Sequence, residues 1–291
     1  MADTIELAGP DGAAATFALR GAEPMAWRAR GRDLLWHGDP AHWDFRAPIL
    51  FPLVGASRDG VVRVGGRDFP MPQHGFARRA VFRAVEVAGD RALLRLEDDA
   101  ASLAAYPFPF RLDVAVTLGA ATLRLDWTVA NPGHEPMPYA LGFHPAFPWP
   151  FAARNRAGHA VLFEKPERAE VPDVAPGGLL ARTRRPVPME GRNLPLSPDL
   201  FTEALVFLDA ESRRMAFAGP DGAAIALETE GFPHLAVWTR PTAPFLSLEC
   251  WTGHADWADA EGDLASRGSM IVLPAGASRR HAATLVFESA P

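Results

Sequence analysis

Two of the nine histidines lie in sequence surroundings that suit proton transfer. His74 is part of PQHGFAR (72–78) and His144 is part of GFHPAFPWP (142–150), and in both motifs glycine and aromatic residues flank the ring at an expected strand end. An imidazole can act as a general acid or a general base near neutral pH. Taken alone, each histidine fits a hydrogen-bonded structural role at least as well, so a partner group has to decide.

An acid in an apolar strand is the candidate partner. Glu249 lies in FLSLECW (245–251), where strand alternation puts its side chain on the opposite face from Leu248 and Cys250. Such an acid is either exposed on an edge strand or held in a cleft. In a cleft walled by aromatic rings, desolvation raises the pKa of a carboxyl and lets it act as a base near neutral pH.

One arginine also needs a partner. Arg46 precedes the apolar run of FRAPILFPLVGASRDG (45–60), where its charge requires either a salt bridge or an anionic or polyol ligand. The sequence has no GxSxG, GxGxxG or Walker A motif. We assign the remaining histidines to the surface or to structural roles: His37, His42, His134, His159, His234, His254 and His281.

A metal site is a weaker alternative. The sequence has neither HExxH nor paired CxxC motifs, and Cys250 is its one cysteine. His74, His144 and Glu249 could in principle converge as a His₂Glu zinc site, which their spacing neither supports nor excludes. We expect no metal at the site.

The elements that must position these residues are mostly strands. Apolar residues alternate with polar ones on both sides of Gly119, which predicts a hairpin over 112–129. Similar patterns predict two further hairpins, over 81–97 and 270–287, and the segment 234–251 is predicted to form two strands joined by a Pro-containing loop. Repeated hairpins with little helix indicate an all-β fold, a large antiparallel β-sandwich, and we expect residues 1–291 to form a single domain.

Helix is expected in two short segments. Residues 99–105 could form two turns, with Asp98 or Asp99 as N-cap and Pro107 as the stop, and residues 255–265 could form another short helix. The stretch 165–200 alternates weakly and is rich in Pro, Gly and Arg. A loop of that length usually has structure of its own or a role at a site.

Composition excludes several classes of function. The 291 residues are 48% hydrophobic and 22% charged, which is ordinary for a globular protein. The net charge is −6, without a basic stripe, so nucleic-acid binding is not expected. The N-terminus does not resemble a secretory signal, and the chain has no apolar run of about 18 residues. A lone cysteine cannot form an internal disulfide, and we expect a cytoplasmic protein that does not bind membranes.

Five segments form an ordered set along the chain: FRAPILFPLVG (45–55), QHGFAR (73–78), YPFPF (106–110), ANPGHEPMPYALGFHPAF (130–147) and FLSLECWTG (245–253). In order and spacing this set resembles the aldose 1-epimerase family, also called galactose mutarotase-like proteins. The resemblance extends from about Thr4 to about Glu288. It implies a large antiparallel β-sandwich with a carbohydrate cleft on one concave sheet, in agreement with the strand pattern.

The resemblance also implies roles for individual residues. His144 would be the general acid and Glu249 the general base. Arg46 and His74 would hold sugar hydroxyls or the ring oxygen, and Arg78 would line or brace the same site.

Two further residues follow from the same resemblance. Many relatives carry an Asp before the strand that corresponds to 204–208, whereas this chain has Glu203, with a longer side chain, which would contact the substrate. Trp238, within Leu235 to Thr239, would be a wall on which a sugar stacks.

The implied activity is that of an isomerase, an aldose 1-epimerase or mutarotase, which interconverts the α and β anomers of a hexose and needs no metal or organic cofactor. A base takes the proton of the C1 hydroxyl while an acid protonates the ring oxygen, and the opened ring closes from the other face.

Two alternatives stay open. A hexose-6-phosphate 1-epimerase would bind the phosphate through Arg46, Arg78 or the arginines of 182–192. A non-catalytic carbohydrate-binding protein could use the same fold. We favour a free sugar as the ligand, and expect a monomer or homodimer.

Overall fold

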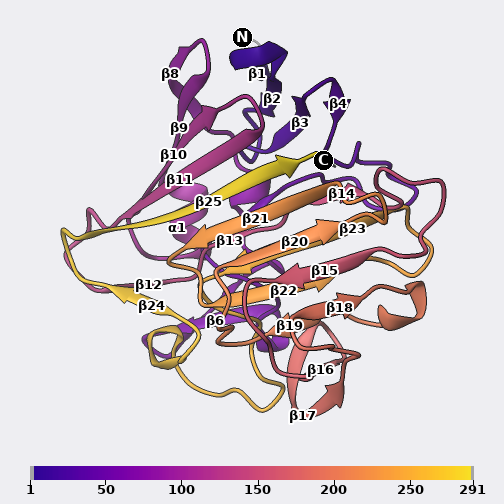
Figure 1. Cartoon of the computed structure of the whole chain (residues 1–291). Helices are drawn as coiled ribbons and strands as arrows, with labels where there is room; N and C mark the ends of the chain where they lie inside the picture. The colour runs from indigo at the N-terminus through magenta and orange to yellow at the C-terminus, as the bar shows by residue number, and fades with distance from the viewer. Residues whose placement is uncertain (1–2, 290–291) are drawn as a thin grey trace.

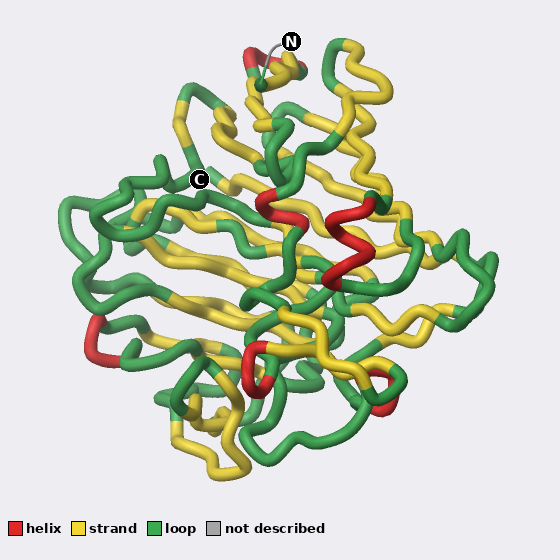
Figure 2. Tube along the Cα trace, turned by 180° about the vertical axis from the view of Figure 1, so that it is seen from behind, coloured by secondary structure: helices red, strands yellow, loops and turns green. Residues whose placement is uncertain are grey.

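The computed structural model describes residues 3–289, which are mostly antiparallel strands (Figure 1). Met1, Ala2, Ala290 and Pro291 lie outside the described residues. The short helical segments lie at the ends of strands and in connections (Figure 2). No helix within residues 3–289 is long and apolar enough to cross a membrane.

The larger of two extended sheets has nine strands. In spatial order they are β18 (Asn193–Pro195), β15 (Ala160–Phe163), β20 (Arg214–Ala218), β21 (Ala224–Glu230), β25 (Ser278–Glu288), β11 (Thr122–Ala130), β10 (Arg111–Leu118), β9 (Arg91–Glu97) and β8 (Arg83–Ala88). Side chains of β10 and β11 alternate between buried and half-buried, so one face of this sheet is covered and the other meets solvent.

The smaller extended sheet is almost completely buried. Its strands are β19 (Leu205–Phe207), β22 (His234–Trp238), β23 (Phe245–Trp251), β13 (Gly142–Phe143) and β5 (Ile49–Leu50), and β14 (Ala146–Pro148) also pairs with β23. Every residue of β23 is buried. This explains its nearly continuous apolar sequence, since both of its faces are covered.

Smaller elements surround the two sheets. The strands among them are β1 (Thr4–Ala8), β2 (Ala14–Ala18), β3 (Pro24–Ala29), β4 (Arg32–Asp33), β6 (Val61–Val64), β7 (Arg67–Pro70), β12 (Met137–Tyr139), β16 (Glu170–Ala175), β17 (Leu179–Pro186) and β24 (Ile271–Leu273). The helical elements are α1 (Ala100–Ala105) and 3₁₀ turns at Pro10–Gly12, Arg58–Gly60, Ala77–Arg79, Pro198–Leu200 and Leu264–Ser266.

The main hydrophobic core lies between the two extended sheets. Trp127 of β11 packs against Phe143 of β13 with ring centroids 5.4 Å apart, which joins the nine-stranded sheet to the smaller one. Leu248 and Cys250 of β23 belong to the same core. Because successive side chains of a strand point to opposite faces, Glu249 points away from this core. The arrangement confirms the predicted antiparallel β-sandwich.

Two of the three predicted hairpins are confirmed, β8–β9 within 81–97 and β10–β11 over 111–130. The two strands predicted within 234–251 are also present, as β22 and β23, and they pair with each other. The hairpin over 270–287 is wrong. The chain turns at Gly276 as expected, but β24 then pairs with β12 whereas β25 pairs with β11 and β21. The two strands follow one turn and enter different sheets, which their alternation alone does not reveal.

One of the two predicted helices is confirmed. Asp99 caps α1, because its carboxylate accepts the backbone N–H of Ser102 at 2.7 Å. The helix over 255–265 is wrong, and only the 3₁₀ turn Leu264–Ser266 forms there. The backbone N–H groups of Asp256 and Ala258 donate instead to carbonyls of Ala56 and Leu180, which holds this stretch against other segments.

A buried residue of the smaller sheet and a partly exposed residue of the larger sheet provide a test of the layer assignment. Leu248→Ala removes a fully buried side chain between the sheets and is expected to lower the free energy of unfolding by about 2–5 kcal/mol. The matched truncation Leu162→Ala, in β15 at 39% exposure, is expected to cost well under about 1.5 kcal/mol. Urea denaturation of both variants measures the difference, and equal losses would contradict the assignment.

Candidate active site

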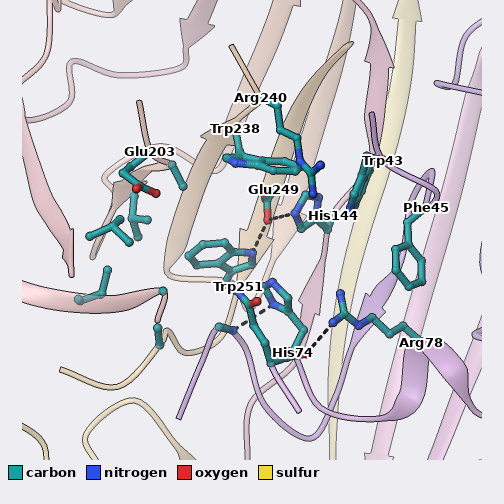
Figure 3. A pocket seen from close by; sticks show the side chains of 18 of the residues that line it. Trp43, Phe45, His74, Arg78, His144, Glu203, Trp238, Arg240, Glu249 and Trp251 are labelled. Atoms are coloured by element: carbon teal, nitrogen blue, oxygen red, sulfur yellow. Dashed lines mark hydrogen bonds and ion pairs between the residues drawn. The ribbon is translucent and has the colours of Figure 1, made fainter. Parts of the chain in front are cut away.

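The smaller sheet brings His144 and Glu249 face to face (Figure 3). β13 and β14 both pair with β23, and in the same register. His144 lies between these two strands, which puts it opposite Glu249. The two side chains meet, with His144 Nε2 3.2 Å from Glu249 Oε2. On the other side Glu249 is paired with Ala236 of β22.

This contact has almost no access to solvent. The side chains of His144 and Glu249 are 8% and 1% exposed. Burial lowers the pKa of His144 to about 3 and raises the pKa of Glu249 well above its ordinary value of 4.5, while the indole N–H of Trp251 acts on Glu249 in the opposite direction. Burial disfavours both charged forms. We therefore infer that at neutral pH one transferable proton is shared between Glu249 and His144, so that the pair has no net charge.

Aromatic rings enclose His144. Trp43 lies 4.8 Å from its ring and Trp238 lies 5.4 Å from it, centroid to centroid, and the two indoles meet edge to face. His144 Nδ1 is buried and has no hydrogen-bond partner among the described residues. The rings therefore hold the imidazole by packing while Nε2 is directed at Glu249.

His74 is held by two hydrogen bonds with the backbone of Gly55. It adopts a φ of 66°, and the backbone N–H of Gly55 donates to its Nδ1 at 3.1 Å while its own N–H donates to the Gly55 carbonyl at 2.8 Å. A ring whose Nδ1 accepts carries its proton on Nε2 when neutral. Burial, with the charges of His144 and Arg78, lowers the pKa of His74 well below 6.5. His74 is therefore a neutral donor, 5.9 Å from the ring of His144.

The glycine after His74 is required by a close approach of two chain segments. A Cβ at residue 75 would lie 2.3 Å from the carbonyl oxygen of Phe51, and Gly75 has a φ of +70°. Both features explain why PQHGFAR has glycine at this point.

A cavity of about 350 Å³ opens above these groups. It is lined by Trp43, Asp44, Phe45, Gly55, Gln73, His74, Arg78, His144, Val174, Gly178, Leu180, Glu203, Ala204, Val206, Trp238, Arg240, Glu249, Trp251 and Ala255. Val174, Gly178 and Leu180 belong to the β16–β17 hairpin and its turn, within 165–200. That stretch therefore has structure of its own and also forms part of the cavity, as its length suggested.

Two arginines line the cavity. Arg78 donates from Nη2 to the Gln73 carbonyl at 2.8 Å and lies over the ring of Phe45, but its Nε is buried without a partner among the described residues. Burial lowers the pKa of Arg78. Arg240 also lines the cavity, and within residues 3–289 its side chain makes no hydrogen bond or salt bridge.

Arg46 does not line the cavity, contrary to its expected contact with sugar hydroxyls. Its guanidinium lies against Gly38 and Met25, 3.6 Å from the Met25 sulfur, and its backbone N–H donates to the buried carboxylate of Glu23. The side chain is thus directed into the packing beside the cavity. We do not include Arg46 among the proposed sugar ligands.

The remaining predicted residues line the cavity on different sides. Trp238 belongs to the aromatic wall around His144, and Glu203 lies across the cavity from Arg78 and Phe45 (Figure 3). The Glu203 carboxylate has no hydrogen-bond partner among residues 3–289. None of the histidines that we assigned to surface or structural roles lines the cavity.

Sequence reasoning missed several lining residues: Trp43, Phe45, Gln73, Arg240 and Trp251. Trp251 follows Glu249 by two residues, so strand alternation could have placed it on the same face. Trp43, Phe45 and Arg240 lie in loops, where no periodicity indicates which side chain faces the site. Among the described residues no group of three His, Cys, Asp or Glu is arranged to bind a metal ion, so His74, His144 and Glu249 do not form the His₂Glu set considered above.

Comparison with known proteins gives consistent results. The aldose 1-epimerase family model matches residues 3–285. Protein LacX (chromosomal) of Lactococcus lactis subsp. lactis is 30% identical over 264 residues, covering 86% of this chain and 88% of that protein. A galactose mutarotase-like protein from Lactobacillus casei superposes with a TM-score of 0.90 at 28% identity, covering 98% of this chain and 100% of that one. Galactose 1-epimerase from Lactobacillus acidophilus shares the fold, with a TM-score of 0.71 at 14% identity over 98% of this chain and 94% of that one.

Proposed function

Because the chain belongs to the aldose 1-epimerase family, we propose that it is an isomerase that interconverts the α and β anomers of a hexose, with Glu249 as general base and His144 as general acid. The observation that carries this proposal is the 3.2 Å contact between His144 Nε2 and Glu249 Oε2 at the floor of the cavity. A protein that only binds sugar has no need of an acid beside a base.

The proton transfers balance within this pair. Glu249 takes the proton of the C1 hydroxyl, O1 becomes the aldehyde oxygen, and the bond between C1 and the ring oxygen breaks. The electron pair of that bond stays on the ring oxygen, which takes the proton of His144 Nε2. After rotation about C1–C2 the transfers reverse, so the ring closes on the other face and the pair regains its starting protonation.

Other lining residues suit a sugar as ligand. Trp43 and Trp238 offer apolar faces to the ring carbons, and His74 offers an Nε2–H donor to a hydroxyl or the ring oxygen. Glu203 offers a free carboxylate to hydroxyls on the far side. These contacts would orient the ring over the pair.

Glu249→Gln tests the proposal against the binding-only alternative. The amide keeps the shape of the side chain but cannot take a proton, so we expect anomer exchange to slow by roughly 100-fold or more. Polarimetry of freshly dissolved α-D-glucose and α-D-galactose measures the exchange, and calorimetry should detect sugar binding by the same variant. Full activity of the variant would contradict the assigned base. Binding by the wild-type protein without any exchange would favour a binding protein.

The buried pair also predicts the pH dependence of kcat/KM. The active form has one proton on the pair. Because burial lowers the pKa of His144 to about 3, a second proton binds only in acid, and the acid limb should lie below the ordinary histidine value of 6.5. Because burial raises the pKa of Glu249, the shared proton is kept well above pH 4.5, so activity should fall only on the alkaline side of that raised value. A pH profile measured by NMR exchange checks both limbs, and an acid limb at or above 6.5 would contradict this assignment.

A hexose 6-phosphate is a second candidate substrate, favoured by the two arginines of the cavity. In a pyranose, the ring oxygen is bonded to C5, which carries C6, so protonation of that oxygen by His144 turns C6 toward the His144 side. Arg78 lies on this side, whereas Glu203 lies across the cavity (Figure 3). A guanidinium suits a phosphate through paired hydrogen bonds.

Kinetic measurements with the phosphosugar and with free glucose separate the two candidate substrates. If the phosphosugar is the substrate, Arg78→Gln and Arg240→Gln should each lower its kcat/KM by about tenfold or more and affect free glucose less. Arg182→Gln is the matched control, because Arg182 lies on Trp257 and Asp259 outside this cavity. Equal effects of the cavity variants on both sugars, or faster exchange with free glucose, would favour the free hexose.

A further inference from the structure

We propose that Trp251 is a positioning residue that holds the carboxylate of Glu249 and directs its second oxygen to the substrate. The inference rests on the proposed role of Glu249 as base. Trp251 follows Glu249 by two residues in β23, so both side chains lie on the cavity face of the sheet. The indole Nε1 donates to Glu249 Oε2 at 3.1 Å (Figure 3).

The indole is fixed by its surroundings. Trp251 is 6% exposed and packs in a small apolar cluster with Leu50 and Val54, separate from the main core. Its partner across the strand pair is Gly142, where an added Cβ would lie 3.0 Å from Cδ1 of the indole. The ring is therefore packed closely against Gly142, where a larger residue would press on it, and its N–H has a defined direction.

His144 and Trp251 both contact the same oxygen of Glu249. His144 Nε2 is 3.2 Å from Oε2 and Trp251 Nε1 is 3.1 Å from it, whereas Oε1 has no hydrogen-bond partner among the described residues. Two contacts on one oxygen set the plane of the carboxyl group. The atom left for the proton of the sugar hydroxyl is Oε1.

The indole N–H also matters for the charge of the base. Glu249 must be ionised to take a proton, and no cation forms a salt bridge with it within residues 3–289 apart from a protonated His144. His144 Nε2 lies 3.2 Å from Oε2 as the ion-pair partner of the carboxylate. The Trp251 N–H is the group that donates a hydrogen bond to Oε2, and a hydrogen bond to an ionised acceptor is among the stronger ones.

The test removes the N–H and keeps the ring. Replacement of Trp251 by the isosteric 3-benzothienylalanine, with Trp251→Phe as a simpler variant, should make loss of the shared proton harder. We expect the alkaline limb of kcat/KM to move up by roughly one to two pH units. We also expect kcat at neutral pH to fall by about tenfold, with a smaller change in KM for the isostere.

A measurement that does not depend on enzyme activity separates the role proposed for Trp251 from the proposed function. Infrared difference spectra between the wild-type protein and Glu249→Gln identify the Glu249 carboxyl band, and its pH titration should shift upward in both Trp251 variants. Trp149→Phe is the matched control, because Trp149 is fully buried, lies outside the cavity lining, and its Nε1 has no partner among the described residues. Its titration should not move.

An isostere variant that is folded by circular dichroism and titrates like the wild type would overturn the proposal. So would a loss of stability without any shift of the Glu249 band, since that is the result of a packing role alone. If the wild-type protein exchanges no sugar tested, the proposed function fails, while the infrared titration still decides the contact between Trp251 and Glu249.

Discussion

The burial of one carboxyl group in the middle of a sheet is the constraint on which the rest of the site depends. Glu249 is 1% exposed, and an acid in such a place is tolerated only with partners, because water no longer solvates its charge. His144 and Trp251 are those partners. Both contact Oε2, and Oε1 has no hydrogen-bond partner among residues 3–289.

The β-sandwich makes this burial possible because β23 has two different faces. Leu248 and Cys250 fix the strand to the core between the sheets, which gives Glu249 a rigid base on the opposite face. Ala236 is its cross-strand neighbour on β22, and the cavity opens above Glu249. Alternate residues of one strand thus face the core and the candidate site, and the β16–β17 hairpin and loops line the space above it.

Much of the fold could be predicted from the sequence because local patterns determine it. Alternation over 112–129 and the Asp99 cap of α1 involve neighbouring residues, and both predictions are correct. The hairpin over 270–287 failed because two strands joined by a turn can enter different sheets. The helix over 255–265 failed because its N–H groups bond to distant carbonyls.

The sequence by itself determined the kinds of groups available and the faces on which strand residues lie: a carboxyl at Glu249 opposite the core, and imidazoles at His74 and His144 within motifs of a known family. Only the tertiary structure decided which groups meet. It put His144 on Glu249, brought Arg240 to the cavity and turned Arg46 away. The physical reason is that these contacts join segments far apart in the chain, and neither periodicity nor motif spacing specifies such a distance.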